Sequence, residues 1–236
     1  MSRLKVFAIV LILFTGWVSN AQENIIKAGL SGAFLGDFNL AYEKMFNSNR
    51  SLQMKFGYLN PVVSPFFTEE TITPEAYAFI QENGGMSASL EYRFYISEKL
   101  SAEGFYIAPY LRWFNQFVDY EDEIDSRIYS VNTKLNTLGM GAQLGYQWIF
   151  GEMFTVDFHF LGIGLDYYMT KLIYTMDPKP AGFDYSEVTP HIEDVFSDII
   201  YLKNRLKHEV NEDNHTSKLP FFFPGFRMGI SLGFAF

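Results

Sequence analysis

Segments in which apolar and polar residues alternate recur along this chain. A period of two is typical of β-strands, because successive side chains of a strand point to opposite faces of the sheet. The alternating segments span residues 25–35, 38–46, 52–59, 85–96, 105–113, 137–150, 154–168 and 226–236. The pattern predicts an all-β protein with eight antiparallel strands, and ten strands is the alternative.

The segment over residues 154–168 changes phase once. Its apolar face begins with Val156, Phe158 and Phe160. It then changes phase and continues with Leu161, Ile163 and Leu165. A slip of one residue is what a β-bulge produces. We expect the bulge at Gly162 or Gly164.

The two faces of the predicted strands differ in side-chain size. One face carries Phe, Tyr, Trp, Leu and Met, whereas the other carries Gly, Ala and Ser beside charged residues. An eight-stranded barrel is only wide enough inside for side chains to fill it, so ranks of large rings would not fit there. The sequence therefore predicts one antiparallel transmembrane barrel with its bulky apolar face in lipid. A soluble barrel with an apolar interior is the alternative.

Charged residues on the small face are then expected in the lumen. They are Lys27, Glu43, Lys55, Glu91, Arg93, Arg112, Asp157, Asp166 and Arg227, with His159 nearby. An unpaired charge in a poorly hydrated interior costs several kcal/mol, so cations and carboxylates should pair. This predicts a structural polar network that plugs the lumen, with a narrow ion or water path as the alternative.

The connections alternate between short and long. Residues 47–50, 97–103 and 151–153 are short turns, whereas residues 60–84 and 169–224 are long and residues 117–132 are intermediate. The tight turn at residues 36–37 breaks the trend. Short periplasmic turns and long outer loops are typical of outer-membrane barrels, and an even strand number puts both termini in the periplasm.

The first residues predict export from the cytoplasm. Arg3 and Lys5 precede an apolar run over residues 6–14, and small residues follow at a cleavage site ending at Ala21. This pattern is typical of a secretory signal peptide, so we expect a signal peptide over residues 1–21 and one barrel domain over residues 22–236. The aromatic content of 18% fits the aromatic girdles of membrane barrels. The formal charge of −9 argues against nucleic acid as a partner.

An amphipathic helix is expected from Pro190 to Val210, within the last long connection. Thr189 is a suitable N-cap and Pro190 a suitable first helical residue. Its apolar stripe consists of Ile192, Val195, Phe196, Ile199, Leu202 and Leu206. The stripe either caps the barrel of this chain or binds a protein partner.

Several segments resemble a family of small outer-membrane barrels of Gram-negative bacteria with no assigned function. They are GLSGAFLGDFNLAYEKMF, SLEYRFYI, EGFYIAPYLRWF and GYQWIF, between Ile25 and Tyr168. The last strand, which ends in Phe236, resembles the C-terminal signal that the barrel-insertion machinery recognises. The resemblance implies location in the outer membrane and contact with its lipid and lipopolysaccharide, and it supplies no catalytic residues.

Candidate chemistry is sparse. Asp157 and His159 share a face, as two members of a hydrolase triad could, but no nucleophile is marked. The acidic residues Glu121, Asp122, Glu123 and Asp125 could bind a divalent cation, although a solvated loop is the simpler interpretation. We expect no catalytic, cofactor or metal site and a structural or binding role at the cell surface. A narrow pore or transport accessory and a lipid-modifying enzyme are the alternatives.

Overall fold

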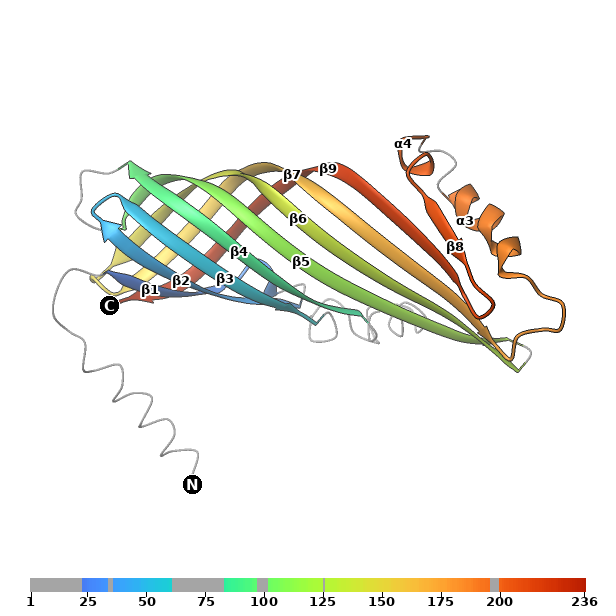
Figure 1. The fold of residues 1–236 in the computed structure, drawn as a ribbon. Coiled ribbons are helices and arrows are strands. Elements are labelled where there is room, and N and C mark those ends of the chain that lie inside the picture. Colours follow the sequence, from blue (N-terminus) through green and yellow to red (C-terminus); the bar gives the residue numbers. More distant parts are fainter. Residues whose placement is uncertain (1–22, 34–35, 61–82, 97–101, 125, 196–199) are drawn as a thin grey trace, which may run out of the picture.

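The computed structural model describes residues 23–33, 36–60, 83–96, 102–124, 126–195 and 200–236. These residues are mostly antiparallel β-sheet, as the alternation predicts (Figure 1). The strands are β1 (Asn24–Gly29), β2 (Asp37–Asn47), β3 (Arg50–Leu59), β4 (Asn83–Ile96), β5 (Gly104–Ile124), β6 (Arg127–Phe150), β7 (Phe154–Asp177), β8 (Lys207–Val210) and β9 (His215–Ala235). The helices are the 3-10 helix η3 (Tyr185–Val188), α3 (Thr189–Val195) and α4 (Ile200–Lys203). None of the described helices has the length and apolar character that crossing a membrane requires.

The sheet closes on itself because its first and last long strands pair. The strand order is β1-β2-β3-β4-β5-β6-β7-β9-β8, and β1 also pairs with β9, so that Ile25 lies opposite Ala235. Phe236 N donates to Asn24 O at 2.8 Å, and Asn24 N donates to Phe236 O at 3.1 Å. Within the described residues β8 pairs with β9 alone and stands outside the ring.

One end of the ring carries short turns. Asn47 pairs with Arg50 across a two-residue turn. Phe150 pairs with Phe154, and the turn between them holds Gly151 and Glu152 at positive φ. The predicted turns at residues 47–50 and 151–153 are therefore present. A buried apolar cluster lies among the interior side chains; it consists of Ile25, Met45, Tyr95, Ala102, Tyr106, Ala108 and Ala235.

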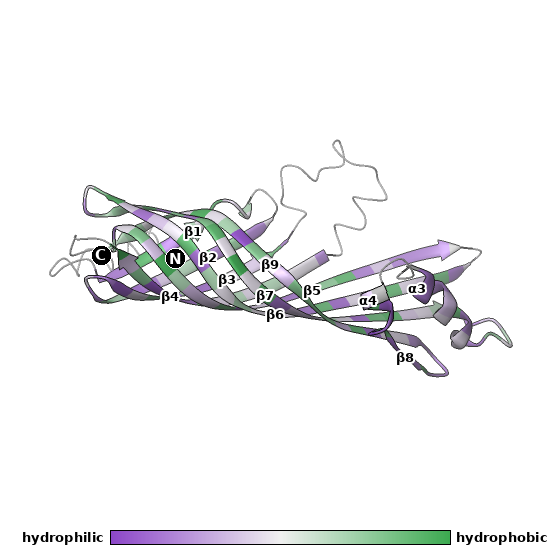
Figure 2. Cartoon of the chain, turned by 90° about the horizontal axis from the view of Figure 1, so that it is seen from above, coloured by the Kyte–Doolittle hydropathy of each residue, from purple (hydrophilic) through white to green (hydrophobic). Residues whose placement is uncertain are grey.

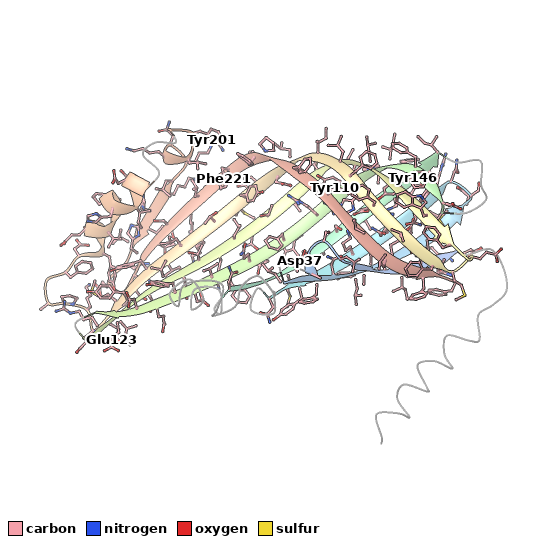
Figure 3. The ribbon with its side chains drawn as sticks, turned by 180° about the vertical axis from the view of Figure 1, so that it is seen from behind. Asp37, Tyr110, Glu123, Tyr146, Tyr201 and Phe221 are labelled. Carbon is pink, nitrogen blue, oxygen red and sulfur yellow. The ribbon has the colours of Figure 1, made fainter. Side chains whose placement is uncertain are left out.

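Four strands extend well past the others (Figure 1). β5 and β9 have 21 residues and β6 and β7 have 24, compared with 11 in β2 and 10 in β3. We call the extension the arm; it comprises residues 115–124, 127–136, 170–177 and 215–220. Figure 3 places Glu123 at the tip of the arm and Tyr146 toward the opposite end of the molecule. The expected connection over residues 117–132 is thus wrong, because these residues form the β5–β6 hairpin apart from its tip.

The expected helix from Pro190 to Val210 is also wrong as a single element. α3 and α4 are short, and residues 207–210 form β8, in which Lys207 pairs with Lys218 and Val210 with His215. β9 extends past β1 and has an open edge there, so pairing with β8 satisfies backbone groups that a helix would leave exposed. Ile192, Leu202 and Leu206 are half-buried, whereas Phe196 and Ile199 lie outside the described residues, as do residues 1–21.

Two further features differ from those predicted from the sequence: the end of β1 and the position of the bulge in β7. β1 ends at Gly29, because Ala33 N donates to Leu30 O and turns the chain before residue 35. The β7 bulge is not at a glycine. Gly145 pairs with His159 and Leu144 with Leu161, so that Phe160 is the extra residue.

Candidate functional site

The lumen of the ring is polar. The structure places all ten predicted lumen residues on the interior face. Lys27, Glu43, Glu91, Arg93, Asp157, His159 and Asp166 are buried. The side chains of Lys55, Arg112 and Arg227 are 15%, 26% and 11% exposed. The interior is therefore closed by charge at one level and becomes more open toward the arm.

Two cations and two carboxylates form the centre of the closed level. Lys27 Nζ lies 2.5 Å from Glu43 Oε2 and 2.8 Å from Asp157 Oδ2. The Arg93 guanidinium donates to Asp157 Oδ2 at 2.7 Å and lies over the ring of Tyr106 at 4.3 Å. Each charge thus has an opposite charge in contact, which offsets the cost of removing it from water.

Glu91 is the acceptor of a second group. It accepts from Arg93 at 2.8 Å and from the amides of Gln53 and Gln143 at 2.9 Å. Its other oxygen lies 3.4 Å from Arg227 Nη2 and 3.9 Å from Lys55 Nζ. One carboxylate therefore joins β3, β4, β6 and β9 across the lumen.

Neutral polar side chains complete the network, and the sequence analysis did not single them out. Tyr95 and Tyr106 donate to Glu43 and Asp157 at 2.7 Å. Ser51 donates to Glu43, and Lys27 donates to Gln147. Gln147 in turn donates to the Ala102 carbonyl at 2.7 Å, which ties the backbone just before β5 to the network. The alternation pattern could have identified these residues, because they occupy the same strand face as the charged residues.

A separate ion pair lies nearer the arm. Arg112 contacts both oxygens of Asp166, with Nε at 3.1 Å from Oδ1. Asp166 fits between two glycines: a Cβ at Gly139 would overlap one of its oxygens, and a Cβ at Gly225 would overlap the other. The glycines on neighbouring strands thus provide the space that the carboxylate needs.

The structure does not assemble the two candidate reactive sites. Asp157 accepts from Lys27, Arg93 and Tyr106, and no hydrogen bond joins it to His159 within the described chain. In the acidic segment, Glu121 and Glu123 alternate with Asp122 along β5, and Asp125 lies outside the described residues. No group of three potential metal-ligating side chains occurs among the residues described.

The exterior of the ring is apolar. Hydrophobic residues recur along its strands (Figure 2), and many of them are exposed. Its side chains include Leu40 at 64% exposure, Phe56 at 66% and Met140 at 63%. Aromatic side chains gather at both ends. The cross-strand row next to the arm consists of Trp113, Leu138, Tyr167 and Phe222, and a row at the other end consists of Phe150, Phe154 and Phe234. Large apolar groups exposed on all these strands form a continuous band.

The polarity of the two faces is reversed in the arm. Exterior positions become mainly polar; they include Asn115, Asp119, Asn132, Lys134, Asn136, Lys171, Thr175, Thr216 and Lys218, with Phe117, Ile128 and Ile173 as exceptions. Positions that continue the lumen face become mainly apolar; they include Val118, Tyr120, Val131, Leu135, Leu172, Tyr174 and Leu219. The arm therefore has the pattern of a sheet in water, whereas the ring has the opposite pattern.

The segment between β7 and β9 folds onto the arm. Tyr185 is buried against Tyr174, and its hydroxyl accepts from Met176 N at 3.1 Å. Thr189 Oγ1 lies 3.0 Å from His215 Nε2. Burial, with His208 as a second cause, lowers the pKa of the His215 imidazole. The segment thus caps its own sheet through η3, the start of α3 and β8.

These features define a class of protein: a closed antiparallel β-barrel with a charged interior and an apolar exterior. Residues 6–178 match the DUF3575 family, described as a protein of unknown function, and the chain belongs to that family. No curated protein matches the chain.

Two solved structures are similar to it. The N-terminal β-barrel domain of Pseudomonas aeruginosa OprF is 13% identical, with 92% of this chain and 100% of that chain covered and a TM-score of 0.36. A major outer membrane protein from Thermus thermophilus is also 13% identical, with 90% and 98% covered and a TM-score of 0.34.

Proposed function

We propose that this protein is an eight-stranded barrel of the bacterial outer membrane with a plugged lumen and a non-enzymatic binding role. Both ends of the described chain then lie in the periplasm, and the arm projects from the cell surface. One observation carries the proposal. Charged groups such as Arg93 and Glu91 are buried, while Phe56 and Met140 are exposed, which is favourable only where lipid surrounds the ring.

The height of the apolar band supports a membrane location. On β6 the exterior apolar side chains extend from Leu138 to Phe150, twelve residues further along the strand. At about 3.4 Å per residue this is about 41 Å along the strand. A strand tilted by about 45° spans about 29 Å of that along the membrane normal, close to the hydrocarbon core of about 30 Å. Aromatic rows at both ends match the two interfaces.

A plugged lumen fits the network better than a pore does. Lys27, Glu43 and Arg93 are no more than 1% exposed, so their level of the lumen leaves no continuous water path between them. We expect folded protein to give no discrete conductance steps in planar bilayers. Reproducible steps would favour the narrow pore or transport accessory instead.

A binding role is favoured by the arm. Its lumen-facing side is apolar and only partly covered, with Tyr120 41% exposed. A partly exposed apolar sheet face outside the band is a typical protein-contact surface. A protein partner could also contact the segment over residues 190–210 through Ile192, Leu202 and Leu206. An unchanged lipid profile in a deletion strain would further support the binding role over a lipid-modifying enzyme.

Two tryptophans permit a direct test of membrane placement. Trp113 lies in the aromatic row next to the arm and Trp148 near the other end of the band, and both are partly exposed on the exterior. The third tryptophan of the chain lies in the predicted signal peptide. Each of the single variants Trp113→Phe and Trp148→Phe therefore retains one fluorescent tryptophan after the signal peptide is removed. The variants are placed in vesicles whose lipids carry quenchers at graded depths. For each tryptophan, the fluorescence should be quenched most strongly by quenchers near a membrane interface.

The controls use aqueous iodide and one-sided quenchers. Trp113 and Trp148 should respond to quenchers in opposite leaflets, and neither should be fully accessible to iodide. Full iodide quenching without quenching by lipid labels would contradict the membrane proposal. Migration of unheated and heated samples on a gel provides an independent check that each variant is folded.

A further inference from the structure

Four lysines form an in-register row across the exterior of the arm. Lys134 of β6 pairs with Lys171 of β7, Lys171 pairs with Lys218 of β9, and Lys218 pairs with Lys207 of β8. Residues directly opposite in antiparallel strands point to the same face, and neighbouring strands lie about 4.8 Å apart. The row therefore concentrates four ammonium groups on one narrow strip.

The protein supplies little compensating charge. Glu209 Oε1 lies 2.6 Å from Lys218 Nζ, and Lys218 with Lys171 lowers the pKa of the Glu209 carboxyl. Within the described part of the chain, Lys134, Lys171 and Lys207 form no ion pair. Like charges directly opposite each other destabilise a sheet, so an external anion would stabilise this arrangement.

The row lies where a lipid head group would be. Lys171 comes two residues after Met169, and Lys218 two residues before Pro220, which are the last exterior positions before the polar region of these strands. The aromatic row of Tyr167 and Phe222 lies one step further into the band, with ring centroids 4.7 Å apart. Aromatic girdles of membrane barrels mark the interface, and phosphates of lipids lie just outside it.

We propose that the row formed by Lys134, Lys171, Lys207 and Lys218 binds the phosphates of an outer-leaflet glycolipid that carries more than one phosphate. This inference rests on the membrane location proposed above. Lysine is a point-charge ligand for phosphate, and several lysines in a strip suit a head group with separated phosphates better than one isolated anion. Phe117, which pairs with Lys134 on the same face and is 42% exposed, offers the acyl or sugar part an apolar contact.

The test compares two variants with the same charge change. The first is Lys134→Gln, Lys171→Gln and Lys207→Gln, which spares the Lys218–Glu209 pair. The control is Lys44→Gln, Arg50→Gln and Lys179→Gln, which removes three cations that are at least partly exposed and do not belong to the row; Lys44 and Arg50 lie beside the turn between β2 and β3. Each protein is placed in phosphatidylcholine nanodiscs and titrated with a fluorescent bis-phosphorylated glycolipid, or with the same lipid after removal of its phosphates.

We expect the row variant to bind the phosphorylated lipid at least about tenfold more weakly than wild type, because each lysine near an anionic surface contributes measurably to affinity. The control should match wild type, and the dephosphorylated lipid should bind all three proteins equally weakly. Affinity should also fall as salt increases. Equal binding by the row variant and the control would overturn the inference, as would competition by inorganic phosphate as effective as that by the lipid.

Failure of this inference is distinct from failure of the membrane proposal. If the tryptophans are quenched by lipid labels and all variants show heat-modifiable migration, the barrel is inserted. A null result for the lysine row then concerns the head-group site alone.

Discussion

The Arg93 guanidinium donates to Asp157 Oδ2 at 2.7 Å, although the two residues are 64 positions apart and lie on β4 and β7, which are not neighbours in the ring. Hydrogen bonds of the sheet join only adjacent strands, so this pair braces the ring across its interior. Lys27 on β1 contacts the same oxygen at 2.8 Å. The lumen network thus joins strands across the ring in addition to the hydrogen bonds of the sheet.

Removing the Asp157 charge should therefore destabilise the folded barrel. Asp157→Asn keeps the size of the side chain but leaves Lys27 and Arg93 with one carboxylate fewer. Breaking a buried ion pair from one side costs about 3–5 kcal/mol. The free energy of unfolding, measured by urea titration in phospholipid vesicles, should fall by about that amount.

The control for this change is an exposed aspartate. Asp213→Asn alters the same charge at an exposed position before β9 and should leave the unfolding free energy within about 0.5 kcal/mol of wild type. Equal stability of Asp157→Asn and Asp213→Asn would mean that the lumen network does not brace the ring.

The sequence predicted the ring well because each ring strand has one polar and one apolar face throughout. For β6, alternation from Thr137 to Phe150 assigned Gln143 and Gln147 to the interior and Met140 to the exterior. The same reasoning placed the charged lumen residues, since their neighbours two positions away share their face. Which charges contact each other depends on the register and curvature of the ring, and these were not accessible from spacing alone.

The arm was missed because its polarity is reversed. On β6, Val131 and Leu135 continue the lumen face, whereas Asn132 and Lys134 continue the exterior face. The strands were predicted from large apolar residues at every second position, on the exterior face. In the arm these positions become polar, so the predicted strands end where the arm begins. The helix expected over residues 190–210 was interrupted for a tertiary reason, because β9 offers an open edge to residues 207–210.

A methyl group at residue 139 should be unfavourable because of Asp166. The Cβ of Gly139→Ala would overlap Asp166 Oδ1, which Arg112 holds in place. We expect a loss of about 1–3 kcal/mol in unfolding free energy, the usual cost of overpacking. In an Asp166→Ala background the clash is absent, so the additional loss caused by Gly139→Ala should shrink to near zero. If Gly139→Ala lowers the unfolding free energy by the same amount in the Asp166→Ala background, its cost does not come from a clash with Asp166.

Arginine at residue 142 distinguishes lipid from water around the ring. Ala142 is exposed on the exterior face of β6, near the middle of the apolar band that extends from Leu138 to Phe150, so Ala142→Arg would be harmless in a soluble barrel. Near mid-membrane depth an arginine costs about 2–4 kcal/mol. Asn132→Arg, on the same strand and face but in the arm, should cost nothing measurable. Urea unfolding in vesicles measures both, and equal tolerance of the two arginines would speak for a soluble ring.

Acid should loosen the segment that caps the arm. His215 has its Nε2 3.0 Å from the Thr189 hydroxyl, and its ring centroid lies 5.1 Å from that of His208, whose Nε2 is 3.7 Å from Glu193. Because burial lowers the pKa of His215, the open segment binds its proton at a higher pH than the closed one does. Closure is therefore fully stabilised above about pH 6.5, the ordinary value, and weakens as pH falls below it.

Hydrogen exchange of the β8 and β9 amides measures this opening. Once intrinsic exchange rates are corrected for pH, protection of residues 207–210 and 215–218 should decrease between about pH 7 and pH 5, while protection of the ring strands stays constant. His215→Gln retains a hydrogen-bonding side chain without an imidazole to protonate, and its protection should depend much less on pH. If His215→Gln and wild type lose protection in parallel, other groups, such as Glu193, must set the response.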